Sequence, residues 1–207
     1  WTMGAGQFCT NPGLIVLPKG PEGDAFLDVA VAALQEVAAQ PMLTTGIADD
    51  FINKTQQIAK MSTLAFQGQT KERDVAPFIS CVSASEFSAN PALRHEVFGP
   101  FGLVVRSPDP ESTLSLAKEL DGQLTCTLQV DEGDAPEARQ LLAILERKAG
   151  RILANGFPTG VEVASAMVHG GPYPASTNFG HTSVGTMAIR RWMRPISYQD
   201  LPDYLVA

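Results

Sequence analysis

Short apolar runs alternate with amphipathic segments of helical length along most of this chain, and this alternation restricts the possible folds more than any other feature. Apolar runs bounded by turn-forming residues predict buried strands at 13–20, 75–84, 101–107, 124–130 and 151–155. Apolar residues at helical spacing predict helices at 23–40, 49–66, 108–120 and 134–149. Strands that alternate with helices in this way form parallel sheets covered by helices. We therefore predict an α/β fold: an open, mainly parallel sheet with helices on both faces and an extended C-terminal tail.

Three of the predicted helices have recognisable ends. Asp24 is placed to cap the N-terminus of the helix at 23–40. Asp109 followed by Pro110 predicts a helix start, because proline at the first helical position has no unsatisfied N–H group. Gly150 is placed to end the helix at 134–149, whose last turn is basic.

The C-terminal quarter has a different character. Residues 155–183 are rich in Gly, Pro, Ser and Thr and show little regular pattern. A loop of this length in a compact domain is usually functional, so we expect it to line a site or an interface. The end of the chain, 184–207, predicts a short helix followed by a strand or an extended tail.

Charge and cysteine content exclude several classes of protein. The net charge is -7, which disfavours binding to nucleic acid or to an anionic membrane. No apolar run approaches the roughly 20 residues of a transmembrane helix. The three cysteines are widely spaced and odd in number, which is typical of reduced thiols in a cytoplasmic protein rather than of disulfides or a zinc site.

The three cysteines lie in two kinds of sequence context. Cys9 sits between Gly6 and the Asn-Pro-Gly of residues 11–13, on a loop where functional groups of an open parallel sheet gather. Cys81 and Cys126 lie inside predicted strands, so we expect them to be core residues. A cysteine–histidine hydrolase remains open at this point, with three candidate partners: His95, His169 and His181. No cluster of His, Cys, Asp and Glu has the spacing of metal ligands, so we expect no metal site.

Two motifs resemble the aldehyde dehydrogenase superfamily. The segment GQFCTNPG, residues 6–13, resembles the active-site loop of this family, in which Gly-Gln-x-Cys carries the nucleophile. The segment EVFGPFGLVV, residues 96–105, resembles the family's Glu-x-Phe-Gly-Pro motif, in the expected order. Further segments, such as NGFPTGVEV and IRRWMRPISYQDLP, are most similar to the subgroup that oxidises 2-oxoglutarate semialdehyde (2,5-dioxopentanoate).

The resemblance implies roles for four residues. Cys9 corresponds to the nucleophile that attacks the aldehyde carbonyl, with its own N–H group helping to hold the developing oxyanion. Glu96 corresponds to the acceptor of hydrogen bonds from the nicotinamide ribose, and Phe98 to the aromatic ring beside the nicotinamide of NAD or NADP. Asn155 corresponds to an asparagine near the substrate pocket. The reaction implied is oxidation of a semialdehyde to a carboxylate through a cysteine thiohemiacetal and thioester.

The resemblance also implies a domain organisation. Residues 1–183 match the family's catalytic domain, and residues 184–207 match a C-terminal helix and tail through which we expect homo-oligomers to form. The N-terminal domain that binds most of NAD or NADP in the family has no counterpart here, and no Gly-rich phosphate loop opens a helix. We therefore expect the chain to be part of a longer protein and to be inactive alone. A non-catalytic assembly module with this fold is a further alternative.

Overall fold

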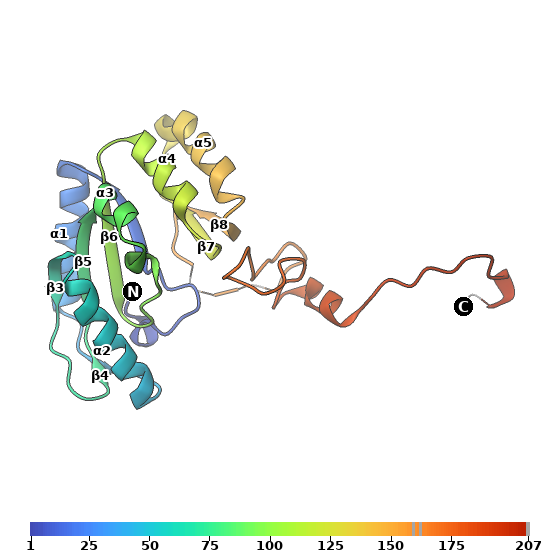
Figure 1. The fold of residues 1–207 in the computed structure, drawn as a ribbon, viewed down its shortest axis with the longest axis horizontal. Coiled ribbons are helices and arrows are strands. Elements are labelled where there is room, and N and C mark those ends of the chain that lie inside the picture. Colours follow the sequence, from blue (N-terminus) through green and yellow to red (C-terminus); the bar gives the residue numbers. More distant parts are fainter. Residues whose placement is uncertain (159, 162, 206–207) are drawn as a thin grey trace.

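The computed structural model describes residues 1–158, 160–161 and 163–205 (Figure 1). The helices are α1 (Pro21–Gln35), α2 (Thr45–Ala59), α3 (Ala84–Ala89), α4 (Pro110–Glu119) and α5 (Ala135–Leu145). The strands are β1 (Leu14–Pro18), β2 (Gln40–Pro41), β3 (Thr63–Gln67), β4 (Asp74–Val75), β5 (Phe78–Ser83), β6 (Phe101–Ser107), β7 (Gln123–Leu128) and β8 (Ala149–Ala154). Short 3-10 helices are η1 (Met3–Gly6), η2 (Pro91–Arg94), η3 (Glu132–Asp134), η4 (Thr186–Trp192) and η5 (Asp203–Leu205).

The main sheet has four strands in the order β1-β6-β5-β3. Strands β1, β6 and β5 are parallel, and β3 joins the edge of the sheet antiparallel to β5. A separate parallel pair is formed by β7 and β8, and a small antiparallel pair by β2 and β4. The prediction of an open, mainly parallel sheet is confirmed.

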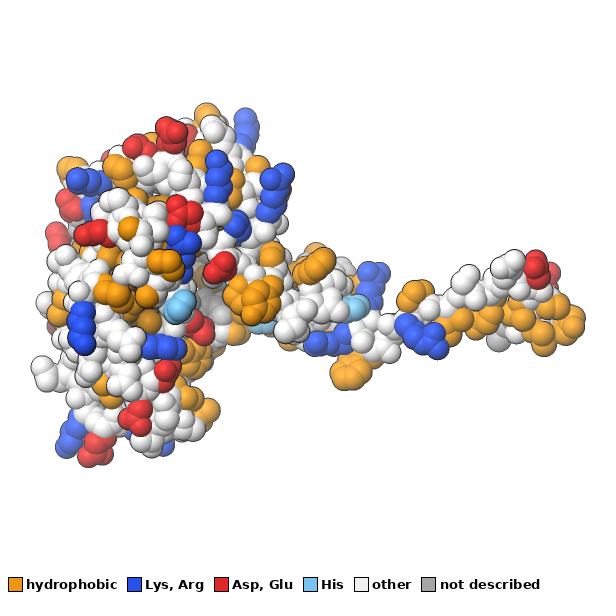
Figure 2. Space-filling model, viewed as in Figure 1, with side chains coloured by type: hydrophobic (Ala, Val, Ile, Leu, Met, Phe, Trp, Pro, Cys, Tyr) orange, Lys and Arg blue, Asp and Glu red, His pale blue; other side chains and the backbone are white. Residues whose placement is uncertain are grey.

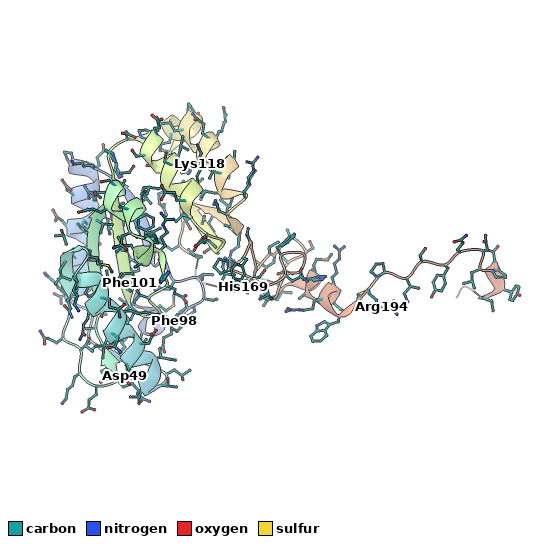
Figure 3. All side chains as sticks on the ribbon, viewed as in Figure 1. Asp49, Phe98, Phe101, Lys118, His169 and Arg194 are labelled. Atoms are coloured by element: carbon teal, nitrogen blue, oxygen red, sulfur yellow. The ribbon has the colours of Figure 1, made fainter. Side chains whose placement is uncertain are left out.

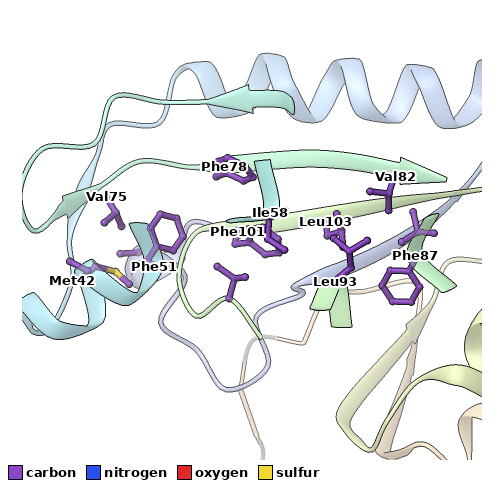
Figure 4. Packing of buried hydrophobic residues seen from close by; sticks show 14 of the residues in the cluster. Met42, Phe51, Ile58, Val75, Phe78, Val82, Phe87, Leu93, Phe101 and Leu103 are labelled. Atoms are coloured by element: carbon purple, nitrogen blue, oxygen red, sulfur yellow. The ribbon is translucent and has the colours of Figure 1, made fainter. Parts of the chain in front are cut away.

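Side chains of the central strands alternate between two hydrophobic clusters. Phe78 and Val82 of β5 belong to the larger cluster, on the face covered by α2, α3 and α4 (Figure 4). Ile79 of β5 and Val104 of β6 belong to a second cluster, which α1 covers through Leu34. A strand whose alternate residues are buried on opposite faces lies between two helical layers. The predicted helices on both faces are therefore confirmed.

The predicted helix at 49–66 is wrong at both ends. Helix α2 begins earlier because the Thr44 hydroxyl caps it, accepting a hydrogen bond of 3.2 Å from the N–H group of Ile47. The helix stops at Ala59, and residues 63–67 form β3, which pairs with β5. Pairing with a strand that comes later in the chain overrides the local helical pattern there.

Two of the three predicted helix ends are also wrong. Helix α1 begins at Pro21 after Gly20, so Asp24 lies within its first turn, where it forms an ion pair with Arg106. Helix α5 ends at Leu145, and Gly150 is a residue of β8. A β-carbon on Gly150 would overlap the carbonyl group of Gly170, which explains a glycine inside this strand.

The third predicted helix end is confirmed. Helix α4 begins at Pro110, and the Asp109 carboxylate accepts a hydrogen bond of 2.7 Å from the N–H group of Ser112. The same hydrogen bond lowers the pKa of Asp109 below its ordinary value.

The chain after β8 is irregular, as predicted, up to η4. Its last residues leave the body of the molecule as an extended tail, which we define as residues 186–205 (Figure 1). Large apolar side chains are exposed along this tail, with Trp192 and Tyr204 each 84% accessible (Figure 2). Residues 206 and 207 of the predicted tail lie outside the described residues. Within those described residues, no helix is both long and apolar enough to cross a membrane.

Candidate active site

Cys9 occupies the corner of a tight turn between η1 and β1, which we call the Cys9 turn (residues 8–11). The N–H group of Asn11 donates to the carbonyl of Phe8 at 3.1 Å, so Cys9 and Thr10 are the two central residues of this turn. The cysteine is exposed, whereas Thr10 is buried. No hydrogen bond among the described residues uses the N–H group of Cys9, which leaves this donor free for a ligand beside the thiol.

The Cys9 turn packs directly against the loop at residues 96–100. The side-chain amide of Asn11 donates to the carbonyl of Gly99 at 3.1 Å, across 88 positions of sequence. A β-carbon on Gly6, at the end of η1 just before the turn, would overlap the same carbonyl, so the backbone there approaches the loop more closely than a side chain allows. Gly99 itself has a φ of +146°, and a β-carbon there would strike Phe51 of α2.

Glu96 and Phe98 lie on this second loop, just before Gly99. Glu96 is exposed and Phe98 is half-buried, while the Val97 side chain between them anchors the loop in the core. Phe98 lies at the turn that leads into Phe101 and β6 (Figure 3). No hydrogen bond or ion pair within the described residues engages the Glu96 carboxylate, so it is available to accept hydrogen bonds from a ligand.

Asn155 lies directly after the last residue of β8. Its backbone φ is +53°, and its side-chain oxygen accepts a hydrogen bond of 2.8 Å from the N–H group of Val130. Three residues later the chain reaches the Cys9 turn, where the Thr10 hydroxyl donates to the carbonyl of Pro158 at 3.3 Å. The structure thus brings the Cys9 turn and the loop of Glu96 and Phe98 together, and it brings Asn155 near them only through the segment 156–158.

A hollow of about 260 Å³ opens beside the Cys9 turn. Its lining is uncharged and mainly apolar: Trp1, Met3, Phe8, Asn11, Pro12, Ile15, Phe26, Phe157 and Pro158. A larger groove, of about 1150 Å³, lies between α2 and β3 and is lined by none of the predicted site residues. Phe8 and Asn11 line the smaller hollow, so this hollow borders the Cys9 turn, although Cys9 itself does not line it.

Sequence reasoning did not identify Thr10, Asn11 or Pro158 as part of the site. The Asn-Pro-Gly of residues 11–13 indicates a loop, but nothing in it predicts that the Asn11 amide reaches Gly99. Such partners are set by tertiary packing, which a single sequence does not encode locally.

The other two thiols differ from Cys9 in their surroundings. Cys81 lies in β5 and Cys126 in β7, as predicted, although both are half-buried rather than fully buried. Burial raises the pKa of the Cys81 thiol, and the nearby Arg106 guanidinium partly opposes this effect. Burial raises the pKa of Cys126 to about 11. Both therefore remain protonated and unreactive near neutral pH.

The histidines show no connection with Cys9. The backbone N–H group of His169 donates a hydrogen bond of 2.9 Å to the hydroxyl of Thr182. Burial, together with the charge of Arg151, lowers the pKa of the His169 imidazole. No hydrogen bond in the described part of the chain joins a histidine to the Cys9 thiol. Residues 1–158, 160–161 and 163–205 also contain no group of His, Cys, Asp and Glu that could hold a metal ion.

The sequence is similar to two semialdehyde dehydrogenases. It is 49% identical to alpha-ketoglutaric semialdehyde dehydrogenase 2 of Azospirillum brasilense, over 99% of this chain and 40% of the relative. It is 43% identical to the alpha-ketoglutaric semialdehyde dehydrogenase of Acinetobacter baylyi, over 99% of this chain and 41% of the relative. The chain thus spans about 40% of the length of these curated relatives. No family model matches it.

The fold is similar to parts of larger solved structures. Betaine aldehyde dehydrogenase from Staphylococcus aureus, in complex with NAD+, matches 91% of this chain with a TM-score of 0.72 and 17% identity, over 39% of its own length. Succinic semialdehyde dehydrogenase from Streptococcus pyogenes, with NADP+, matches 81% of this chain with a TM-score of 0.65 and 19% identity, over 37% of its own length. Identities this low establish a shared fold alone.

Proposed function

We propose that this chain, which belongs to the aldehyde dehydrogenase superfamily, supplies the nucleophile and the nicotinamide-side loop for NAD(P)-dependent oxidation of a semialdehyde. The observation that carries the proposal is the hydrogen bond between Asn11 and Gly99, because it holds the exposed Cys9 beside the loop of Glu96 and Phe98. These two loops carry the two family motifs, and the fold places them in contact although they are far apart in sequence.

Cys9 is the catalytic residue of this proposal. Its thiolate attacks the aldehyde carbonyl to form a thiohemiacetal, and the free N–H group of Cys9 stabilises the developing oxyanion. Loss of hydride from the thiohemiacetal carbon leaves a thioester on Cys9, which water hydrolyses to the carboxylate and the free thiol. A bound nicotinamide cofactor supplies the acceptor for that hydride.

Glu96 and Phe98 are suited to the nicotinamide end of NAD or NADP. The exposed, unengaged Glu96 carboxylate can accept hydrogen bonds from ribose hydroxyls. The half-buried Phe98, which directly precedes Gly99, offers an aromatic face, and this suits stacking beside a planar ring. Most of the cofactor would be held by residues outside this chain, and the choice between NAD and NADP would be made there.

The substrate we propose is 2-oxoglutarate semialdehyde, because the two curated relatives are named for that substrate. The hollow beside the Cys9 turn, whose lining side chains are uncharged, suits the carbon chain of the aldehyde, but none of these side chains supplies a cation for a carboxylate. The distal carboxylate would therefore be bound by groups outside this hollow. Asn155 would act on the pocket indirectly, by directing the segment 156–158 towards the Cys9 turn.

We further propose that residues 1–183 act as the catalytic domain and that residues 184–207, which include the tail, mediate homo-oligomerisation. Exposed apolar residues along the tail support this role, because such surfaces are normally covered by a partner. The three free cysteines fit a reducing compartment, which supports a cytoplasmic location.

The proposal is tested by aldehyde-dependent formation of NADH or NADPH by the protein isolated from its natural source and by its Cys9→Ser variant. We expect activity with the semialdehyde and its loss, by at least about 10³-fold, in the variant. The matched control is Cys81→Ser, which should retain activity because Cys81 lies in β5. Ester hydrolysis without cofactor, in the absence of any dehydrogenase activity, would favour the hydrolase. Absence of both would favour the assembly module.

A further inference from the structure

The Cys9 turn is attached to the rest of the molecule by the two side chains that follow Cys9. On one side, the buried Thr10 donates through its hydroxyl to the carbonyl of Pro158. On the other, the side-chain amide of Asn11 donates to the carbonyl of Gly99. The turn therefore bridges the segment that follows β8 and the loop that precedes β6.

Of these two attachments, only the one made by Asn11 reaches the loop of Glu96 and Phe98. Gly99 comes directly after Phe98, and its carbonyl also accepts the N–H group of Phe101 at 2.8 Å, which fixes it at the start of β6. A β-carbon on Gly6 would overlap the Gly99 carbonyl, so the backbone that leads into the Cys9 turn also packs against the loop without space between them. A displacement of the loop of Glu96 and Phe98 therefore also displaces the Cys9 turn, and the reverse holds as well.

We propose that Asn11 is a positioning residue that couples the nicotinamide-side loop to the nucleophile. This inference rests on the proposed function. When a cofactor engages Glu96 and Phe98, the loop is fixed, and the amide of Asn11 transmits that constraint through Gly99 to the Cys9 turn. The thiol of Cys9 is then held at one distance from the nicotinamide, and its accessibility changes with occupancy of the loop.

A substitution at Asn11 can remove the hydrogen bond to Gly99 without changing the volume that the side chain fills. Aspartate has nearly the same shape as asparagine but has no N–H donor for the Gly99 carbonyl, and it would place a carboxylate against that oxygen. Asn11→Asp therefore removes the hydrogen bond to the Gly99 carbonyl while keeping the volume of the side chain. Thr10→Val likewise keeps the side-chain volume but removes only the hydrogen bond to the Pro158 carbonyl.

The test measures the rate of Cys9 alkylation by iodoacetamide with and without saturating NAD+ or NADP+, on the protein isolated from its natural source and on its variants. We expect the cofactor to change this rate by about fivefold or more in the native protein and in Thr10→Val. In Asn11→Asp, we expect the ratio of the two rates to fall to about 1, with cofactor binding still measurable by calorimetry. Asn53→Asp, which alters an exposed position of α2, is the matched control and should behave as the native protein does.

Kinetic constants provide an independent readout. Because a misplaced nucleophile affects the chemical step more than substrate binding, we expect Asn11→Asp to lower kcat by about tenfold or more while leaving KM for the aldehyde nearly unchanged. If Asn11→Asp fails to fold, Asn11→Ala tests the same hydrogen bond to Gly99.

Each outcome bears on one proposal. A native protein that forms no NADH or NADPH from aldehydes would contradict the proposed function. An active native protein whose cofactor does not alter Cys9 alkylation would overturn the coupling. So would an Asn11→Asp variant that keeps the full effect, because direct shielding of the thiol by the cofactor would then explain it. Loss of the effect in Thr10→Val alone would assign the coupling to Pro158 and overturn the role of Asn11.

Discussion

At the scale of single residues, the three thiols differ in how much protein surrounds them. Cys9 is exposed on its turn, whereas burial raises the pKa of both Cys81 and Cys126. Brief treatment with iodoacetamide near pH 8 should therefore modify Cys9 first, because Cys9 is exposed to the reagent and burial hinders ionisation of the other two thiols. Mass mapping of the labelled peptides checks the order. Labelling of Cys126 should become appreciable only as the pH approaches about 11, and its appearance first would contradict the assignment.

Gly99 is the residue on which the contact between the two site loops depends most directly. With a φ of +146° and Phe51 in the path of any β-carbon, Gly99→Ala combines backbone strain with overpacking. We expect it to lower the free energy of unfolding by roughly 3 kcal/mol or more, measured by urea denaturation. The control is Gly13→Ala, since no atom lies within 4 Å of a β-carbon there. Equal effects of the two substitutions would show that the close approach at Gly99 is not needed.

At the scale of elements, a helix or strand was predictable from the sequence when the residues that determine it are close together in the chain. The start of α4 was predictable because Asp109, Pro110 and Ser112 form a complete cap within four positions of sequence. The strand β6 was predictable because its apolar run is buried on both faces. In contrast, the local pattern of residues 63–66 predicts a helix, but they form part of β3, because pairing with β5 later in the chain decides their structure. The candidate site shows the same division: motifs nominated Cys9 and Glu96, but the hydrogen bond from Asn11 to Gly99 could be found only from the fold.

The cap of α4 also predicts a response to pH. Hydrogen bonds from Ser112 lower the pKa of Asp109 below its ordinary value of 3.8, so the ionised carboxylate stabilises the folded state above that value. This stabilisation is lost as the pH falls through the lowered pKa of the folded state. Asp109→Asn retains a capping side chain without the charge, so its stability should fall less steeply between neutral and acidic pH. Thermal unfolding of both proteins over this range measures the difference, and parallel curves would contradict it.

At the scale of the whole molecule, the tail is the least integrated part of the fold. It extends away from the body with Trp192, Met193 and Tyr198 exposed, which is unfavourable in water unless a partner covers them (Figure 2). We expect self-association at tens of micromolar, and a polypeptide that ends at Gly185 should be monomeric or nearly so. Light scattering of the two compares them directly. A monodisperse monomer for the longer chain would contradict a role of the tail in assembly.

The proposed cofactor site leads to the last prediction: these 207 residues alone should not oxidise aldehydes with either nicotinamide cofactor. The proposed function assigns only Glu96 and Phe98 to the cofactor, and both would contact its nicotinamide end. Holding the hydride acceptor near the reacting carbon contributes about 7–11 kcal/mol to lowering the barrier, and two residues on one loop provide little of the binding that this requires.

Cys9 should nevertheless remain competent in its first step, because its exposure and free N–H group belong to this chain. We expect slow formation of a covalent adduct with an activated ester, detected by mass spectrometry, without production of NADH or NADPH from a semialdehyde. The protein isolated from its natural source, assayed in parallel, should show turnover. Comparable turnover by the 207-residue polypeptide would mean that this chain binds the whole cofactor by contacts other than those assigned to Glu96 and Phe98.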